Sequence, residues 1–186
     1  ALRTVAEEME AALVRAAYSP NITERRDCST ALFDAEGRMA VQSASIPVHL
    51  GAMPEAVTAV RDRGAKAGDL WLVNDPYRGG THLPDLTMIS VLTLDGDPAG
   101  YAVTRAHHAD VGGMAPGSMP AGSRELLQEG LVIPPVRLQA AGRDVAGVMD
   151  ILLANTRTPV ERAGDLRAQR SAHALAQRRL TEVAAR

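Results

Sequence analysis

The sequence contains almost no cysteine, few aromatic residues and little net charge. A single cysteine, Cys28, among 186 residues excludes a disulfide framework and any zinc or iron–sulfur site built from several thiolates. A formal net charge of −2 gives no electrostatic basis for binding nucleic acid or an anionic membrane. Only 3% of the residues are aromatic while 46% are hydrophobic, so the core must be built from Ala, Val, Leu, Ile and Met.

Long uncharged apolar runs and targeting segments are also missing from the sequence. No stretch approaches the roughly 18 residues of a transmembrane helix, and no signal peptide is visible. We expect a soluble, cytoplasmic, globular chain that is long enough to bury a core without a disulfide or metal. Both ends fall inside helical patterns without clear caps, which predicts a fragment of a larger polypeptide.

Signatures of nucleotide binding and of serine hydrolases are absent as well. The sequence has no G-x-x-x-x-G-K-[ST] loop, and no G-x-G-x-x-G follows a predicted strand. It also has no G-x-S-x-G segment, so serine hydrolase chemistry has no support. The chain therefore carries no nucleotide fingerprint of its own.

Hydrophobic patterning and turn signals predict an α+β fold. Apolar residues recur at helical spacing near the N-terminus, and Ser19-Pro20 ends that pattern. Strand-like segments flank turn residues at 34–37 and again at 95–98, which predicts two hairpins. From Pro159 onward an apolar stripe predicts a long amphipathic C-terminal helix. Antiparallel hairpins packed with helices, without alternating strand–helix crossovers, favour α+β over a doubly wound sheet.

The composition changes sharply between residues 111 and 123, where four glycines and two prolines exclude regular structure. We therefore predict an N-terminal α+β region at 1–110 that holds the candidate site, and a Gly/Pro-rich loop at 111–123. A mainly helical continuation is predicted at 124–186. Because the loop directly follows candidate site residues, we interpret it as a lid, the alternative being a flexible connector.

Two polar clusters flank the second predicted hairpin. His82 and Asp85 stand just before its first strand, and the segment "HHAD", residues 107–110, follows its second strand. Antiparallel strands that turn at 95–98 return the chain to the end from which it started. The topology therefore predicts that the two clusters lie close together in space.

The types of side chain in these clusters favour a transition metal. Two imidazoles with one or two carboxylates suit Mn, Fe or Zn better than Ca or Mg, which prefer oxygen ligands. Without cysteine, such a site favours catalysis because coordination positions stay open. Neighbouring residues on a strand point to opposite faces, so His107 and His108 cannot both face one site, and spacing does not choose between them. The competing interpretation makes each histidine a hydrogen-bonded turn residue.

Several other residues allow more than one interpretation. Asp27 is a candidate ligand or base, or else it pairs with a neighbouring arginine. Arg78 could clamp an anionic substrate, although a solvated surface arginine is the more frequent case. His49 is either packed or turned toward the site, and His173 is expected to be solvated. Cys28 is expected to be a small buried hydrophobic residue.

Five segments, in order, resemble the hydantoinase B/oxoprolinase family and together cover nearly the whole chain. They read "AYSPNITERRDCSTALFDAEGRMAVQSASIPVHLGAMPEAV", "GDLWLVNDPYRGGTHLPDLTMISV", "RAHHADVGGMAPGSMP", "LQEGLVIPPVRL" and "NTRTPVERAGDLRAQ". The family includes the B subunits of ATP-dependent N-methylhydantoinases, the C-terminal half of 5-oxoprolinases and, more distantly, the metal-bearing subunit of acetone carboxylases. Its members are much longer, so the resemblance implies an N-terminal portion.

The resemblance implies an ATP-dependent hydrolase that opens a cyclic amide C–N bond, in a ring of the hydantoin or 5-oxoproline type. ATP would be handled by a hydantoinase A-type partner subunit, in a hetero-oligomer that also includes the remainder of the B-type polypeptide. A divalent metal (Mn, Zn or Fe) would be held by His82, Asp85 and His107, which match a His-x-x-Asp pattern with a histidine 25 positions beyond the first.

The resemblance also implies catalytic roles for Asp27, Asp110 and His108. Asp27 or Asp110 is the candidate general base, while His108 and Asp110 match the family's "HHAD" segment and support the site. At Cys28 many members carry phenylalanine, a departure that we expect to alter packing and not chemistry.

Two other functions stay open at this point. A ketone carboxylase subunit of the acetone carboxylase type would use the same metal with bicarbonate as co-substrate. A non-catalytic assembly fragment would lack a complete site. The sequence also leaves open which ring is the substrate, and whether the isolated chain is active.

Overall fold

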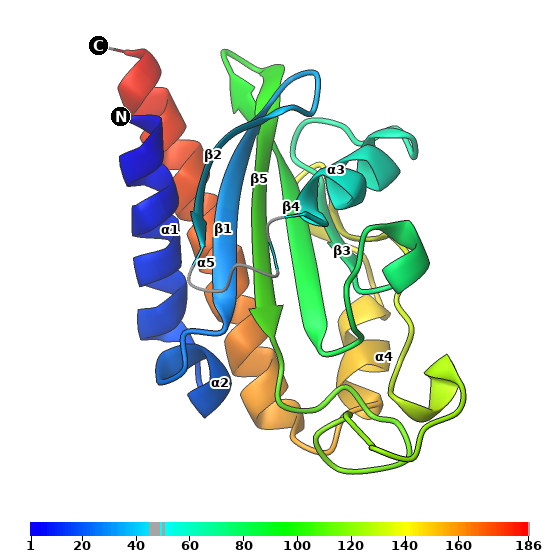
Figure 1. Ribbon diagram of the computed structural model, residues 1–186. Coiled ribbons are helices and arrows are strands. Elements are labelled where there is room, and N and C mark those ends of the chain that lie inside the picture. Colours follow the sequence, from blue (N-terminus) through cyan, green and yellow to red (C-terminus); the bar gives the residue numbers. More distant parts are fainter. Residues whose placement is uncertain (45–48, 50, 186) are drawn as a thin grey trace.

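One antiparallel sheet forms the centre of the molecule. The computed structural model describes residues 1–44, 49 and 51–185. Across these residues seven strands pair in the order β2-β1-β5-β4-β3-β6-β7 (Figure 1). The strands are β1 (Cys28–Asp34), β2 (Met39–Ala44), β3 (Leu70–Val73), β4 (Asp85–Leu94), β5 (Asp97–His107), β6 (Val136–Ala140) and β7 (Arg143–Asp144).

Helices cover the sheet on both faces. The α-helices are α1 (Leu2–Ala16), α2 (Pro20–Thr23), α3 (Met53–Arg61), α4 (Val148–Ala154) and α5 (Pro159–Ala184), and the short 3-10 helices are η2 (Pro76–Arg78) and η3 (Leu126–Gln128). Figure 1 shows α1, in blue, and α5, in orange to red, side by side along the sheet. Among the described residues no helix combines the length and the apolar character needed to cross a membrane.

The residues of β5 show how the strands serve two cores. Ala102 and Ala106 pack in the core beneath α1 and α5, whereas Tyr101 and Val103 pack in the core beneath α3. This alternation follows from the period of two along a strand. Both faces of the central strands are therefore buried. Whether a residue occupies an even or an odd position along the strand decides which set of helices its side chain contacts.

The architecture confirms the predicted α+β fold, with antiparallel hairpins packed against helices and a long C-terminal helix. In the second hairpin Asp95 and Gly96 both have positive φ, 53° and 91°, as a two-residue turn of the I′ type requires. The turn is shorter than the predicted 95–98, because β5 already begins at Asp97.

The strands β6 and β7 were not expected from the sequence. They lie within the segment for which a mainly helical continuation is predicted, and β6 pairs with β3, so the sheet draws on both sides of residues 111–123. The two-residue turn between β6 and β7 consists of Ala141 and Gly142, which both have positive φ, and of these two residues only Gly142 is a turn signal in the sequence. The division of the chain at 111–123 stays a prediction.

Candidate metal centre

The second hairpin brings His82, Asp85 and His107 together at one end of the sheet. Asp85, the first residue of β4, pairs directly with His107, the last residue of β5. Asp85 Oδ1 lies 2.9 Å from His82 Nε2 and 3.1 Å from His107 Nδ1, and the two ring nitrogens are 3.0 Å apart. Two nitrogens and one carboxylate oxygen thus converge on a common point, as the predicted topology requires.

The loop that carries His82 is fixed by close backbone packing. A Cβ on Gly79 would collide with the backbone of Ala56 in α3, and a Cβ on Gly80 would collide with the carbonyl of Asn74. Gly79 also has a positive φ of 91°, which favours glycine. Beyond these glycines the Asp85 amide donates to the His82 carbonyl at 3.0 Å, closing a tight turn. His82 therefore reaches the cluster from a constrained segment.

Asp85 is an ionised carboxylate in a buried position, with 2% of its surface exposed. Burial by itself raises the pKa of this carboxyl, but hydrogen bonds with His107, His49, His82 and Thr81 outweigh it and hold the pKa well below its usual range. The hydrogen bond to Asp85 in turn raises the pKa of His82. The ionised Asp85 therefore supplies a negative charge that favours a cation among the donors of the cluster.

Asp27 and His49 border the cluster. Asp27 Oδ2 lies 3.9 Å from His107 Nδ1, and its side chain is 28% exposed. His49 is buried, with Nε2 at 3.4 Å from Asp85 Oδ2 and Nδ1 at 2.9 Å from the Ser29 hydroxyl. The structure thus places Asp27 beside the cluster, and it makes His49 both packed and turned toward the site.

His108 lies on the opposite face of the sheet from His107, as the parity of a strand requires. Its ring is buried, with Nε2 at 3.0 Å from Gln169 Oε1 of α5. Burial, together with the nearby Arg162 guanidinium, lowers the pKa of His108 to about 3. The structure does not bring this ring to the donor atoms of the cluster.

Asp110 is engaged with the Gly/Pro-rich segment. Its carboxylate accepts hydrogen bonds from the backbone amides of Gly112, Gly117 and Arg157, and from the Arg157 guanidinium at 3.0 Å. Burial raises its pKa, but these donors outweigh burial and lower it. Asp110 therefore organises the start of the 111–123 segment and does not join the three donors.

Arg105 is a residue of the site region that the sequence reasoning missed. Its side chain is fully buried on β5, two positions before His107 and on the same face. Nε donates to the Thr87 hydroxyl and Nη2 to the Gly79 carbonyl, both at 2.7 Å, while Nη1 has no hydrogen-bond partner among the described residues. An arginine inside an apolar strand was the available signal.

Arg78, the other arginine considered for the site, lies apart from the cluster. Its side chain is exposed, and its Nε lies 3.4 Å from a carboxylate oxygen of Asp75. The Asp75 carboxylate also accepts from the Tyr77 amide and so caps the short helix η2. A role for Arg78 at the surface fits these contacts.

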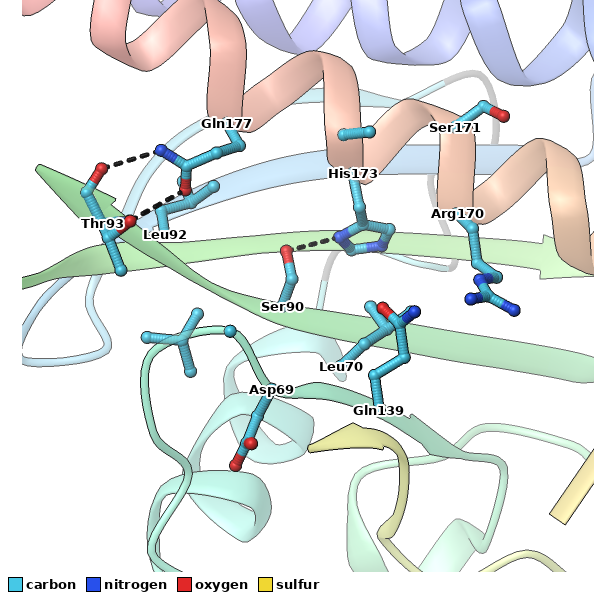
Figure 2. Close-up of a pocket in the computed structure, with 13 residues that line it drawn as sticks. Asp69, Leu70, Ser90, Leu92, Thr93, Gln139, Arg170, Ser171, His173 and Gln177 are labelled. Carbon is cyan, nitrogen blue, oxygen red and sulfur yellow. Dashed lines mark hydrogen bonds between the residues drawn. The ribbon is translucent and has the colours of Figure 1, made fainter. Parts of the chain in front are cut away.

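A cavity of about 480 Å³ lies on the other face, between α5 and the strands β3, β4 and β6. Figure 2 shows His173 and Gln177 of α5 pointing into it, each hydrogen-bonded to β4. The Ser90 and Thr104 hydroxyls lie 2.7 and 3.1 Å from the His173 ring nitrogens. The expectation that His173 is solvated was wrong, because the side chain is only 4% exposed. The two hydroxyls take the place of water as hydrogen-bond partners of the ring, so its burial leaves no ring nitrogen unsatisfied.

A family model matches the whole chain. The family is described as hydantoinase B/oxoprolinase, and its model covers residues 1–186. Among curated relatives, the caprolactamase subunit beta of Pseudomonas jessenii is 35% identical over 98% of this chain and 32% of its own length. The 5-oxoprolinase of Dictyostelium discoideum is 35% identical over 91% of this chain and 14% of its own length.

Solved structures share this fold. The ATP-dependent caprolactamase from Pseudomonas jessenii matches with a TM-score of 0.91 and 34% identity, over 98% of this chain and 32% of that one. An acetone carboxylase matches with a TM-score of 0.91 over 99% of this chain and 25% of that one, and its 22% identity shows the fold alone. The chain spans about a third or less of the length of these proteins.

Proposed function

This chain belongs to the hydantoinase B/oxoprolinase family, and we propose that it supplies the metal-binding part of an ATP-dependent cyclic amidase. The proposed reaction opens a C–N bond in a ring of the hydantoin or 5-oxoproline type. The convergence of His82 Nε2, Asp85 Oδ1 and His107 Nδ1 carries the proposal. The caprolactamase and 5-oxoprolinase names of the relatives support the choice of a cyclic amide.

The donor set of the cluster fits a divalent transition metal. Two imidazole nitrogens and one carboxylate oxygen lie within 4.8 Å of one another, and this mixture suits Mn, Fe or Zn. Three protein donors leave coordination positions for water or substrate. When bound, such a metal supplies Lewis-acid polarisation of a carbonyl group or a water of lowered pKa. We propose His82, Asp85 and His107 as its ligands.

Asp27 is the general base that the arrangement favours. It stands beside His107 and is partly exposed, so its Oδ2 can accept a proton from a water molecule at the edge of the cluster. Asp110, the alternative base, already receives hydrogen bonds from Arg157 and backbone amides. We therefore assign Asp110 a supporting role that holds the neighbouring loop, and His108 a supporting role through its contact with Gln169.

The use of ATP requires a further protein surface. The sequence has no nucleotide-binding motif, whereas the caprolactamase of Pseudomonas jessenii is described as ATP-dependent and its matching chain as a beta subunit. We propose that a hydantoinase A-type partner binds ATP and phosphorylates the ring carbonyl oxygen. The remainder of a longer B-type polypeptide would complete the assembly.

Metal analysis of a His82→Ala variant tests the proposal. Elemental analysis of the full-length protein, purified with its partner, should find a divalent metal in the unaltered protein and none in the variant. ATP-dependent ring opening, assayed with 5-oxoproline, hydantoin and caprolactam, should fall to background. A His173→Ala variant is the matched control and should keep its metal. Full metal occupancy in His82→Ala would refute the site, and bicarbonate-dependent ATP turnover would favour a carboxylase.

A further inference from the structure

The two carboxylate oxygens of Asp85 face different neighbours. Oδ1 points to the candidate ligands, at 2.9 Å from His82 Nε2 and 3.1 Å from His107 Nδ1. Oδ2 points away from these rings and accepts a hydrogen bond from the Thr81 hydroxyl at 2.6 Å. Since an ionised carboxylate only accepts hydrogen bonds, the Thr81 hydroxyl must donate its hydrogen to Oδ2.

His49 is the second neighbour of Asp85 Oδ2. Its Nε2 lies 3.4 Å from Oδ2, so a hydrogen on Nε2 is favoured because a bare lone pair there would face a negative oxygen. In the neutral ring this leaves Nδ1 as an acceptor, and the buried Ser29 hydroxyl lies 2.9 Å from it. The Asp85 carboxylate therefore selects the tautomer of His49, and Ser29, whose hydroxyl can donate to Nδ1, holds the orientation of the ring.

From this geometry we propose that Thr81 and His49 are positioning residues, which occupy Oδ2 of Asp85 so that Asp85 binds the cation through Oδ1 alone. The inference rests on the proposed metal site and adds how its carboxylate is held. Outer hydrogen-bond partners orient metal-binding carboxylates and tune the affinity for the metal. A carboxylate without them is free to turn and offer both oxygens, which would fill a position needed by water or substrate.

Variants of Thr81 test the hydroxyl. In the full-length protein purified with its partner and stripped of metal, Co²⁺ is titrated and its visible absorption recorded. Thr81→Val removes the donor and should weaken Co²⁺ binding by about 10- to 100-fold, the usual effect of losing such a partner. Its absorption should also weaken, because a cobalt ion of higher coordination number absorbs less. Thr81→Ser keeps the hydroxyl and should restore both affinity and spectrum.

Variants of His49 test the imidazole with the same titration. The side-chain amide of His49→Gln can stand in for Nε2 and should retain most of the affinity. The shorter amide of His49→Asn reaches only toward Ser29 and should show the weaker binding expected of Thr81→Val. Thr104→Val is the matched control, since it removes a buried hydroxyl that contacts His173 on the other face. It should leave Co²⁺ binding unchanged.

The outcomes separate this inference from the proposed function. If the unaltered protein binds Co²⁺ and Thr81→Val and His49→Asn match its affinity and spectrum, the positioning role is overturned while the metal site stands. If the unaltered protein binds no Co²⁺, both are overturned. Thermal unfolding of the metal-free variants gives the remaining distinction. Weak binding that Thr81→Ser or His49→Gln does not rescue, together with a lowered Tm, would mark a structural role only.

Discussion

His107 and His108 are neighbours in the sequence, yet their side chains lie on opposite faces of the sheet and contact different hydrogen-bond partners. His107 meets the ionised Asp85 at 3.1 Å, while His108 meets the neutral amide of Gln169 at 3.0 Å. On the first face Asp85 raises the pKa of His82, and on the second burial lowers the pKa of His108 to about 3. A carboxylate oxygen within hydrogen-bond distance of two histidine rings, and not the presence of histidine, distinguishes the candidate site.

The cavity beneath α5 extends the same comparison. It offers space of about 480 Å³, but its hydrogen-bonding groups are matched by other protein groups: His173 by Ser90, and Gln177 by the backbone of Thr93 (Figure 2). In the candidate metal centre, by contrast, a nitrogen of His82, a nitrogen of His107 and an oxygen of Asp85 lie close together. A bound cation would interact favourably with the lone pairs of all three atoms. Converging donors therefore indicate a binding site here better than volume does.

The largest effect is expected from removing the negative charge of Asp85, which distinguishes the candidate metal centre from the opposite face of the sheet. Asp85→Asn keeps the size of the side chain but loses the negative charge, and only one carbonyl oxygen remains to face His82 and His107. We expect both metal content and ATP-dependent ring opening to fall to background, measured by elemental analysis and product formation. His173→Gln serves as the control on the other face. Normal metal occupancy in Asp85→Asn would show that the Asp85 carboxylate is not what makes this face a metal site.

The second expected effect is a pH dependence of stability that comes from the face beneath α5. Burial lowers the pKa of His173 to about 3, from the ordinary value of 6.5, so below pH 6.5 the unfolded chain binds a proton that the folded chain excludes. The free energy of unfolding should therefore fall as pH falls from 6.5 toward 3. At pH 5 the loss from this one group is about 2 kcal/mol.

The check on this dependence is urea unfolding between pH 7.5 and 5 for the unaltered protein and for His173→Gln. The glutamine has no proton to gain, so its free energy of unfolding should decline less steeply. His108 is buried in the same way and contributes to both proteins alike, so the difference between the two curves isolates His173. Parallel curves would show that His173 is charged or solvated in the folded protein.

Much of the fold and part of the candidate site could be predicted from local features of the sequence. The hairpin at Asp95 and Gly96 was predictable because turn residues act locally, and its closure brings His82 and Asp85 to His107. Parity predicted that His107 and His108 diverge, but only the family resemblance chose between them. A choice between two faces depends on which helices cover them, and spacing along one strand does not contain that information.

Contacts between distant segments account for what the sequence did not reveal. β6 pairs with β3 across more than sixty residues, and a strand of five residues gives little periodicity by which to find it. The burial of Arg105 depends on Thr87 and the Gly79 carbonyl, which only the folded sheet brings to it. His173 was likewise expected to be solvated, because its hydrogen-bond partners are hydroxyls of β4 and β5, which lie far from it in the sequence.

The smallest effect is expected at the cavity itself, from Gln177→Ala. The Gln177 amide bonds the backbone N–H and C=O of Thr93 at 2.9 and 2.8 Å, so its loss should lower the free energy of unfolding by about 1–2 kcal/mol. Since Gln177 contacts neither Asp85 nor the histidines beside it, metal content and ring-opening rate should match the unaltered protein. Chemical unfolding and steady-state kinetics on the same preparation measure both quantities. A reduced ring-opening rate with unchanged stability would instead make the cavity beneath α5 part of the functional surface. Both faces of the sheet would then take part in binding, and they would differ only in the kind of ligand that each one binds.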